Sequence, residues 1–128
     1  MRTISREVLE AVRKLVKELS RNEGIAVERA YLFGSYAKGS WIKTSDVDLV
    51  IVSRGFEGMS FLKRLDLVNR VQWRAGIRPF IEAIPLTPDE LKERMEKSAV
   101  LRDASKYWIE IHLDDDLEAP SPSRGTTS

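Results

Sequence analysis

The fold of this chain is decided by two motifs, Gly34-Ser35-Tyr36-Ala37-Lys38-Gly39 and, after a short loop, Ser45-Asp46-Val47-Asp48-Leu49. Asp46 and Asp48 are one residue apart at the head of an apolar, β-branched run. On a strand, such residues share a face with Cα atoms roughly 6.6 Å apart. Two carboxylates placed side by side repel each other, and a divalent cation removes this cost. The second motif therefore predicts a metal site.

The first motif suits a phosphate group. Gly34 allows close backbone approach to a ligand, while the Ser35 hydroxyl and free N–H groups can bind phosphate oxygens. Lys38 adds a positive charge nearby. The spacing also comes close to that of a P-loop, but Ser40 follows Gly39 where that motif requires lysine, which excludes it. Together the two motifs predict a site for a metal–triphosphate complex.

Hydrophobic periodicity and capping residues predict the elements around these motifs. We expect helices over 4–20, 61–74 and 88–97, a further helical stretch to Tyr107, and strands over 26–33, 47–52, 77–85 and 109–113. Thr87 should cap the helix from Pro88, with Glu90 completing a capping box. This order predicts an α/β (α+β) domain around a small mixed β-sheet flanked by helices.

The same patterns predict which residues of helix 61–74, and of the segments after it, are buried and which face solvent. The apolar positions predict a buried side made of Phe61, Leu62, Leu65, Val68 and Val71. Trp73, Tyr107 and Trp108 are expected to be packing residues, and Trp41 to cap the core from a loop. A solvated helix face is the expected setting of the basic residues Lys63, Arg64, Arg70, Arg74 and Arg78.

Composition narrows the possible functions. The chain has 128 residues, with 21 Lys and Arg against 20 Asp and Glu, so a nucleic-acid partner bound by charge alone is disfavoured. There is no cysteine, and His112 is the single histidine, so a zinc site within one chain is implausible. A metal must be held by carboxylates, which suit Mg²⁺ and also Mn²⁺.

The composition of the two ends of the chain predicts its domain organisation and its location in the cell. Residues 1–113 read as one domain, and the acidic, proline-containing stretch 114–128 reads as a disordered tail. Because the N-terminus has no apolar run typical of a signal peptide, and no stretch is long enough to span a membrane, we expect a cytoplasmic protein. The oligomeric state is left open.

The two motifs resemble those of the minimal nucleotidyltransferases, short members of the DNA polymerase beta-like superfamily. The resemblance covers roughly residues 5–113 and includes the MntA-like antitoxin type. It implies the nucleotidyltransferase fold and an enzyme that transfers NMP, normally AMP from ATP, to an acceptor with release of pyrophosphate. Relatives of this kind act on a HEPN-domain toxin, which makes such a protein the expected partner.

The resemblance also implies a role for each site residue. Asp46 and Asp48 would bridge two Mg²⁺ ions, and Glu82, the single acidic residue of strand 77–85, would complete the metal site and help deprotonate the acceptor. Gly34, Ser35 and Lys38 would hold the β- and γ-phosphates of the NTP.

Two residues depart from the family pattern. Tyr36 stands where many relatives have a basic residue, and Glu82 where many have aspartate. These departures motivate one alternative, a protein that neutralises a partner by binding alone. Nucleotidyl transfer to a small molecule or RNA is a further alternative, and the balanced charge makes RNA the weaker of these two acceptors.

Overall fold

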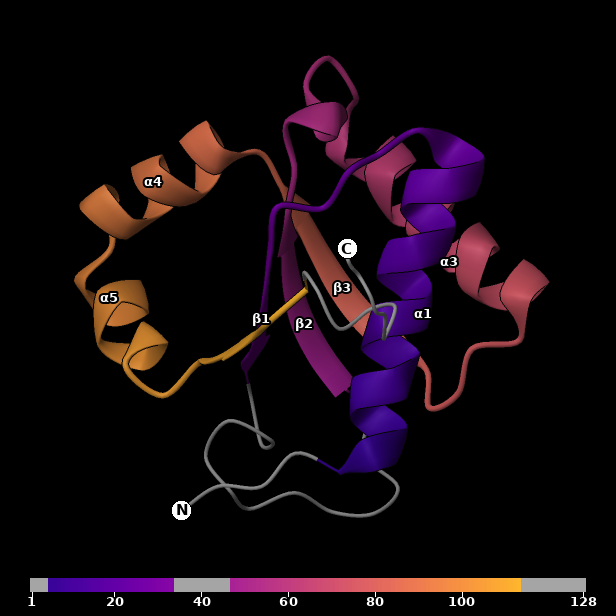
Figure 1. Ribbon diagram of the computed structural model, residues 1–128. Helices are drawn as coiled ribbons and strands as arrows, with labels where there is room; N and C mark the ends of the chain where they lie inside the picture. Colours follow the sequence, from indigo (N-terminus) through magenta and orange to yellow (C-terminus); the bar gives the residue numbers. More distant parts are fainter. Residues whose placement is uncertain (1–4, 34–46, 114–128) are drawn as a thin grey trace, which may run out of the picture.

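The computed structural model describes residues 5–33 and 47–113, which form a mixed sheet flanked by helices (Figure 1). The elements are α1 (Arg6–Glu23), β1 (Arg29–Phe33), β2 (Val47–Val52), the 3-10 helix η1 (Arg54–Phe56), α3 (Phe61–Ala75), β3 (Ile81–Leu86), α4 (Pro88–Lys97), α5 (Ala99–Ser105) and β4 (Ile109–Ile111). The predicted order of helices and strands and the small mixed sheet are therefore confirmed.

The four strands lie in the order β3-β2-β1-β4. β1 is antiparallel to both of its neighbours, while β2 and β3 are parallel. The parallel pair needs a crossover, which η1 and α3 supply on one face of the sheet. β3 and β4 are the two edges.

The main hydrophobic core lies between the sheet and the helices α1 and α3 (Figure 1). Side chains alternate between the two faces along a strand, so every second residue of β2, namely Val47, Leu49 and Ile51, points toward the helices and is fully buried. From α1, Leu15 and Leu19 are also fully buried in this core.

The opposite face of the sheet carries a smaller apolar cluster beside α4 and α5. Val50, Val52 and Leu86 are its buried members, and Leu91 and Trp108 pack against them. Neither α4 nor α5 contributes a buried residue, so this face is covered less completely than the other.

Local signals fix the helix ends as the sequence predicted. Gly24 and Gly76 adopt the left-handed conformation (φ 70° and 66°) at the ends of α1 and α3, where glycine carries no Cβ penalty. At the start of α4, the Thr87 hydroxyl accepts from the Glu90 N–H, and the Glu90 carboxylate accepts from the Thr87 N–H. The predicted capping box is confirmed.

Two predictions about α3 are wrong. Its buried side consists of Arg64, Leu67, Val68, Val71 and Gln72, whereas Phe61 and Leu62 are exposed. Val68 and Val71 are buried as predicted. The buried stripe at 64, 67, 68, 71 and 72 includes two polar residues, so a count of apolar positions wrongly assigns Phe61 and Leu62 to the buried side.

Other differences concern single residues and the third strand. Trp73 and Tyr107 are exposed rather than packed, whereas Trp108 does pack as predicted. β3 begins at Ile81, not at residue 77, because a turn follows the end of α3 at Gly76. Among the described residues, none of the helices combines the length and apolar character needed to cross a bilayer. The predicted tail, 114–128, and Trp41 lie outside the described residues.

Candidate functional site

Two of the three predicted acidic site residues, Asp48 and Glu82, lie next to each other in the sheet. Asp48 is the second residue of β2 and Glu82 the second residue of β3, and the parallel register pairs them directly. Adjacent strands are about 4.8 Å apart. Because their neighbours Val47, Leu49, Ile81 and Ala83 all point into the main core, both carboxylates project from the opposite face. Asp48 is half-buried and Glu82 is exposed.

Aromatic residues border this pair on the side away from the β3 edge. Phe33 of β1 is the antiparallel partner of Asp48. The Trp108 ring packs against Phe33 and Tyr31, with ring centroids 6.1 and 5.6 Å apart. The carboxylates therefore lie between the β3 edge of the sheet and an aromatic cluster.

The remaining predicted site residues adjoin this pair in the chain. β1 ends at Phe33, directly before Gly34, and β2 begins at Val47, directly after Asp46. The segment between β1 and β2, which contains the first motif and Asp46, therefore leaves and re-enters the sheet at the end that carries Asp48. Gly34, Ser35, Lys38 and Asp46 themselves lie outside the described residues, and their roles stay predictions.

Two side chains of α3 hold β3 in its register. The Gln72 amide donates to the Ile81 carbonyl and accepts from the Ile81 N–H, both at 2.8 Å, and Gln72 is buried. Arg64 donates to the Pro85 carbonyl at 3.1 Å. These bonds satisfy outward-facing backbone groups of the edge strand, which protects that edge from pairing with another chain.

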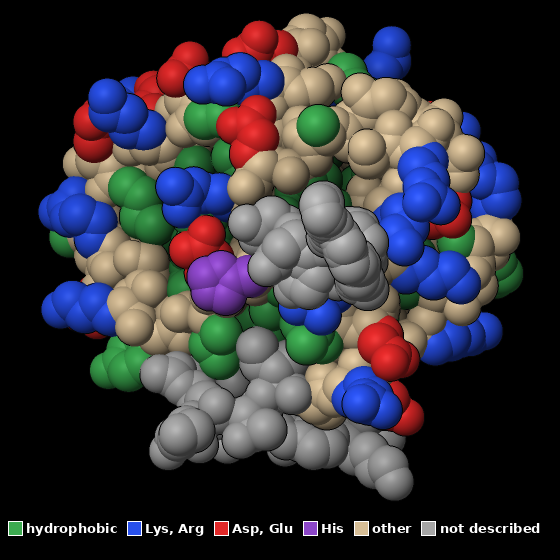
Figure 2. Space-filling view, viewed as in Figure 1, with side chains coloured by type: hydrophobic (Ala, Val, Ile, Leu, Met, Phe, Trp, Pro, Cys, Tyr) green, Lys and Arg blue, Asp and Glu red, His purple; other side chains and the backbone are tan. Residues whose placement is uncertain are grey.

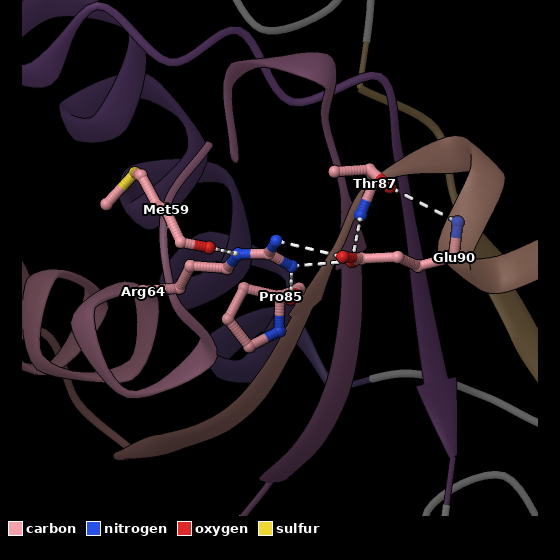
Figure 3. Close-up of polar contacts among 5 residues, drawn as sticks. All are labelled: Met59, Arg64, Pro85, Thr87 and Glu90. Carbon is pink, nitrogen blue, oxygen red and sulfur yellow. Dashed lines mark hydrogen bonds and ion pairs between the residues drawn. The ribbon is translucent and has the colours of Figure 1, made fainter. Parts of the chain in front are cut away.

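Arg64 also forms a bidentate ion pair with Glu90 (Figure 3). The two N–O distances are 2.6 and 2.9 Å, and the Arg64 side chain is only 6% exposed. Its third partner is the Met59 carbonyl, which accepts a hydrogen bond from the Arg64 Nε at 3.0 Å. The same Glu90 carboxylate closes the capping box, so one cluster joins α3, the end of β3 and the start of α4.

This cluster shifts the acid–base properties of both partners. Hydrogen bonding to the Arg64 guanidinium lowers the pKa of Glu90 from 4.5 to about 2, against the opposing effect of burial. The same bond raises the pKa of Arg64. Both groups are therefore charged at any ordinary pH. The prediction that Arg64 belongs to a solvated basic face is wrong, since its position on the 64/67/68/71/72 stripe places it inside.

Arg64 and Gln72 are supporting residues that the sequence prediction missed. Their spacing of eight residues, on the same helical stripe as Leu67, Val68 and Val71, is the signal that places both on the buried side. Nothing in the sequence identifies their backbone partners on β3, because Pro85 lies 21 residues after Arg64 and Ile81 lies nine residues after Gln72.

Comparison with known proteins supports an assignment. The family model of a nucleotidyltransferase domain matches residues 12–119. A candidate protein adenylyltransferase from Methanocaldococcus jannaschii is 25% identical over 105 residues, which cover 82% of this chain and 99% of the relative. Another from the same organism is 39% identical over 72 residues, covering 56% of this chain and 78% of the relative.

Solved structures agree in fold. The crystal structure of a candidate nucleotidyltransferase from Sulfolobus solfataricus matches with a TM-score of 0.52 and 26% identity, over 73% of this chain and 84% of that one. A toxin–antitoxin structure with AMP-PNP matches with a TM-score of 0.50 and 15% identity, over 81% and 72%. At that identity the second match speaks for the fold alone. The expected fold and enzyme class are thereby confirmed: the chain belongs to the nucleotidyltransferase domain family.

Proposed function

We propose that this protein transfers AMP from ATP to a hydroxyl group of an acceptor protein. The observation that carries the proposal is the direct pairing of Asp48 with Glu82 on the sheet face opposite α1 and α3. Two carboxylates on adjacent strands repel each other, and a divalent cation bound by both would stabilise the pair. The candidate adenylyltransferases of M. jannaschii are relatives whose assigned acceptor is a protein, which supports a protein acceptor here.

Mg²⁺ fits the donor set, and Mn²⁺ fits it as an alternative. Asp48 and Glu82 offer carboxylate oxygens, the ligands that these hard cations prefer. Among residues 5–33 and 47–113 no group of three or more metal-binding side chains occurs. The proposal therefore requires Asp46 as the third ligand. Once bound, such a cation would neutralise charge on the α-phosphate during transfer.

The side chains of the protein have distinct parts in the proposed reaction. The acceptor oxygen forms a bond to the α-phosphorus of ATP, the bond from that phosphorus to the bridging oxygen breaks, and pyrophosphate leaves. Glu82, exposed at the sheet edge, receives the proton of the acceptor hydroxyl. Gly34, Ser35 and Lys38 hold the β- and γ-phosphates.

For the acceptor we propose a HEPN-domain toxin, which would make this protein an antitoxin. The motif resemblance motivates this partner. The toxin–antitoxin structure with AMP-PNP, which shares the fold, is compatible with it. A cytoplasmic location belongs to the same proposal.

The test is transfer of label from α-labelled ATP with Mg²⁺ to the product of the neighbouring gene. We expect label on that protein with the unmodified chain and none with Asp48→Asn or Glu82→Gln. Asp66→Asn is the matched control, because Asp66 is an exposed acid on α3 that pairs with Arg70, and it should transfer normally.

Two outcomes would change the reading. Equal labelling by Asp48→Asn would remove Asp48 from the catalytic site and contradict the proposal. Neutralisation of the partner by the double variant Asp46→Ala, Asp48→Ala, without any label, would instead favour a protein that acts by binding alone.

A further inference from the structure

Gln72 is a polar residue that lies buried at the end of α3. It is only 2% exposed, although Figure 2 shows several Lys and Arg side chains at the surface on the side of the molecule where α1 and α3 lie. A buried amide costs free energy unless both its donor and its acceptor are bonded. Both bonds of Gln72 go to one residue, Ile81, whose C=O accepts from the amide and whose N–H donates to it, each at 2.8 Å. The side-chain amide therefore takes the place of a neighbouring strand at this position.

The direction of the backbone groups along β3 shows which residue this pairing affects. The C=O groups of Phe80 and Leu86 both accept hydrogen bonds from the β2 side, at 3.3 and 2.9 Å. Because the N–H and C=O groups of successive residues alternate between the two edges of a strand, those of Glu82 also face β2, and those of Ile81 face outward. Gln72 thus holds the immediate neighbour of the proposed proton acceptor.

A second side chain of α3 holds the other end of β3. Arg64 donates to the Pro85 C=O at 3.1 Å, so α3 runs antiparallel to β3 (Figure 1). From Arg64 to Gln72 the helix rises roughly 12 Å, at ~1.5 Å per residue. From Ile81 to Pro85 the strand spans roughly 13 Å, at ~3.3 Å per residue. Because these two spacings nearly match, both bonds form in one register of the strand against the helix.

The start of β3 is the part of the strand that most needs such support. β3 is an edge strand, Ile81 is its first residue and Glu82 its second. Strand ends open locally at a lower free energy than strand centres do. Opening at Ile81 would carry Glu82 with it, and a displacement of about 1 Å at a reacting group can slow a reaction roughly 100-fold.

We infer that Gln72 is a positioning residue for Glu82; this inference rests on the proposed function. By bonding both outward-facing groups of Ile81, Gln72 keeps the start of β3 closed against β2 and holds Glu82 opposite Asp48. It acts from the helix-covered side of the sheet and touches no group of the proposed catalytic site.

The first test is amide hydrogen exchange followed by NMR, which does not depend on activity. In Gln72→Leu, protection of the Glu82 N–H should fall at least ten-fold more than that of the Ser53 N–H, which donates to the Leu86 C=O at the far end of β3. Equal losses of protection at Glu82 and Ser53 would overturn the inference.

Glu90→Gln is the matched control, because it weakens the Arg64 cluster at the far end of the same strand. Its loss of stability in urea should be comparable to that of Gln72→Leu. The exchange pattern should be reversed, with Ser53 losing more protection than Glu82. If Glu90→Gln exposed the Glu82 N–H as much as Gln72→Leu does, the effect would be general loosening, and the inference would fall.

The second test is transfer of label from α-labelled ATP to the product of the neighbouring gene, at a temperature where circular dichroism shows each variant to be folded. For Gln72→Leu we expect kcat to fall at least ten-fold and KM for ATP to change less than three-fold, because the proposed phosphate-binding residues lie between β1 and β2. Glu90→Gln should keep both parameters. An unchanged kcat in folded Gln72→Leu would overturn the inference.

Gln72→Glu keeps the shape of the side chain and serves if Gln72→Leu does not fold. Burial raises the pKa of the introduced carboxyl group. Protonated at pH 6, this group can make both bonds to Ile81, whereas ionised at pH 8.5 it cannot donate to the C=O. Relative to the unmodified chain at the same pH, kcat should be reduced at pH 8.5 and recover at pH 6. A ratio that stays constant with pH would overturn the inference.

Exchange and transfer are read separately, so the two proposals fail in different ways. If the unmodified chain transfers label and folded Gln72→Leu transfers it equally well, the positioning role falls and the proposed function stands. If the unmodified chain transfers no label but the exchange pattern is as expected, the proposed reaction falls, while Gln72 still holds Glu82 beside Asp48.

Discussion

Replacing Glu90 by Gln should destabilise this protein more than any single change to a surface ion pair. The replacement keeps the size of the side chain but removes the charge opposite Arg64, whose side chain is only 6% exposed. A pKa of about 2 in place of 4.5 corresponds to about 3 kcal/mol at ~1.36 kcal/mol per pKa unit. Because the Glu90 side chain is 40% exposed, solvent screens the pair, and a loss of only about 2 kcal/mol is expected.

The assay is urea unfolding followed by circular dichroism at pH 7, with Glu93→Gln as the matched control. Glu93 pairs with Lys97 on the same helix, but both side chains are more than 60% exposed, so its loss should leave the unfolding free energy nearly unchanged. If Glu90→Gln and Glu93→Gln had the same stability, the claim that the Arg64 cluster ties α3 to β3 and α4 would be refuted.

The same ion pair gives stability a defined pH dependence. The pKa of Glu90 is lower in the folded state than in the unfolded state, so its contribution is fully present above about pH 4.5 and is lost as the pH falls toward 2. The unmodified chain should therefore lose more stability across this window than Glu90→Gln does. Parallel curves for the two proteins would contradict the assignment of this pKa shift to the folded state.

Three further changes test other parts of the structure. Gln72→Leu leaves the buried N–H and C=O of Ile81 without their partner and should cost about 2–4 kcal/mol in urea unfolding. Leu15→Ala, in the main core, should cost about 2–5 kcal/mol in the same assay. Gly24→Ala, at φ 70°, should lower the melting temperature through a strain of about 1 kcal/mol, and an unchanged melting temperature would argue against the left-handed cap.

Local chemistry accounts for the parts of the fold that the sequence predicted well. The capping box at Thr87 and Glu90 and the glycine caps at Gly24 and Gly76 depend on residues within a few positions of one another. The β-branched run at 47–52 likewise predicts both ends of β2 correctly. Such features need no knowledge of distant contacts, because the interaction and its signal lie in the same short segment.

The wrong predictions for Arg64 and Trp73 involve contacts between segments that are distant in the chain. The sequence pattern predicts Arg64 at the surface, because its partners, Glu90 and the Pro85 carbonyl, become apparent only in the folded structure. Trp73 reads as a core residue because most tryptophans pack, and only the rotation of α3 shows that it faces outward. For the site, the family resemblance implies that Asp48 and Glu82 belong together. Their direct pairing follows from the parallel register of β2 and β3, which joins segments that are distant in the chain.

That register links the stability of this fold to its proposed chemistry. A slip of one residue between β2 and β3 would move Glu82 from the open face to the helix-covered face, because side chains alternate along a strand. Three features oppose the slip: the burial of Ile81 and Ala83 in the main core, the two bonds of Gln72 to Ile81, and the bond of Arg64 to the Pro85 carbonyl. The hydrogen bonds lie at the edge of β3 toward α3, and the burial of Ile81 and Ala83 lies on the sheet face that α1 and α3 cover, so all three features are away from the carboxylates. The residues that keep Glu82 beside Asp48 are therefore separate from those that would touch a substrate, and a change at Gln72 should reduce transfer without altering any group of the proposed catalytic site.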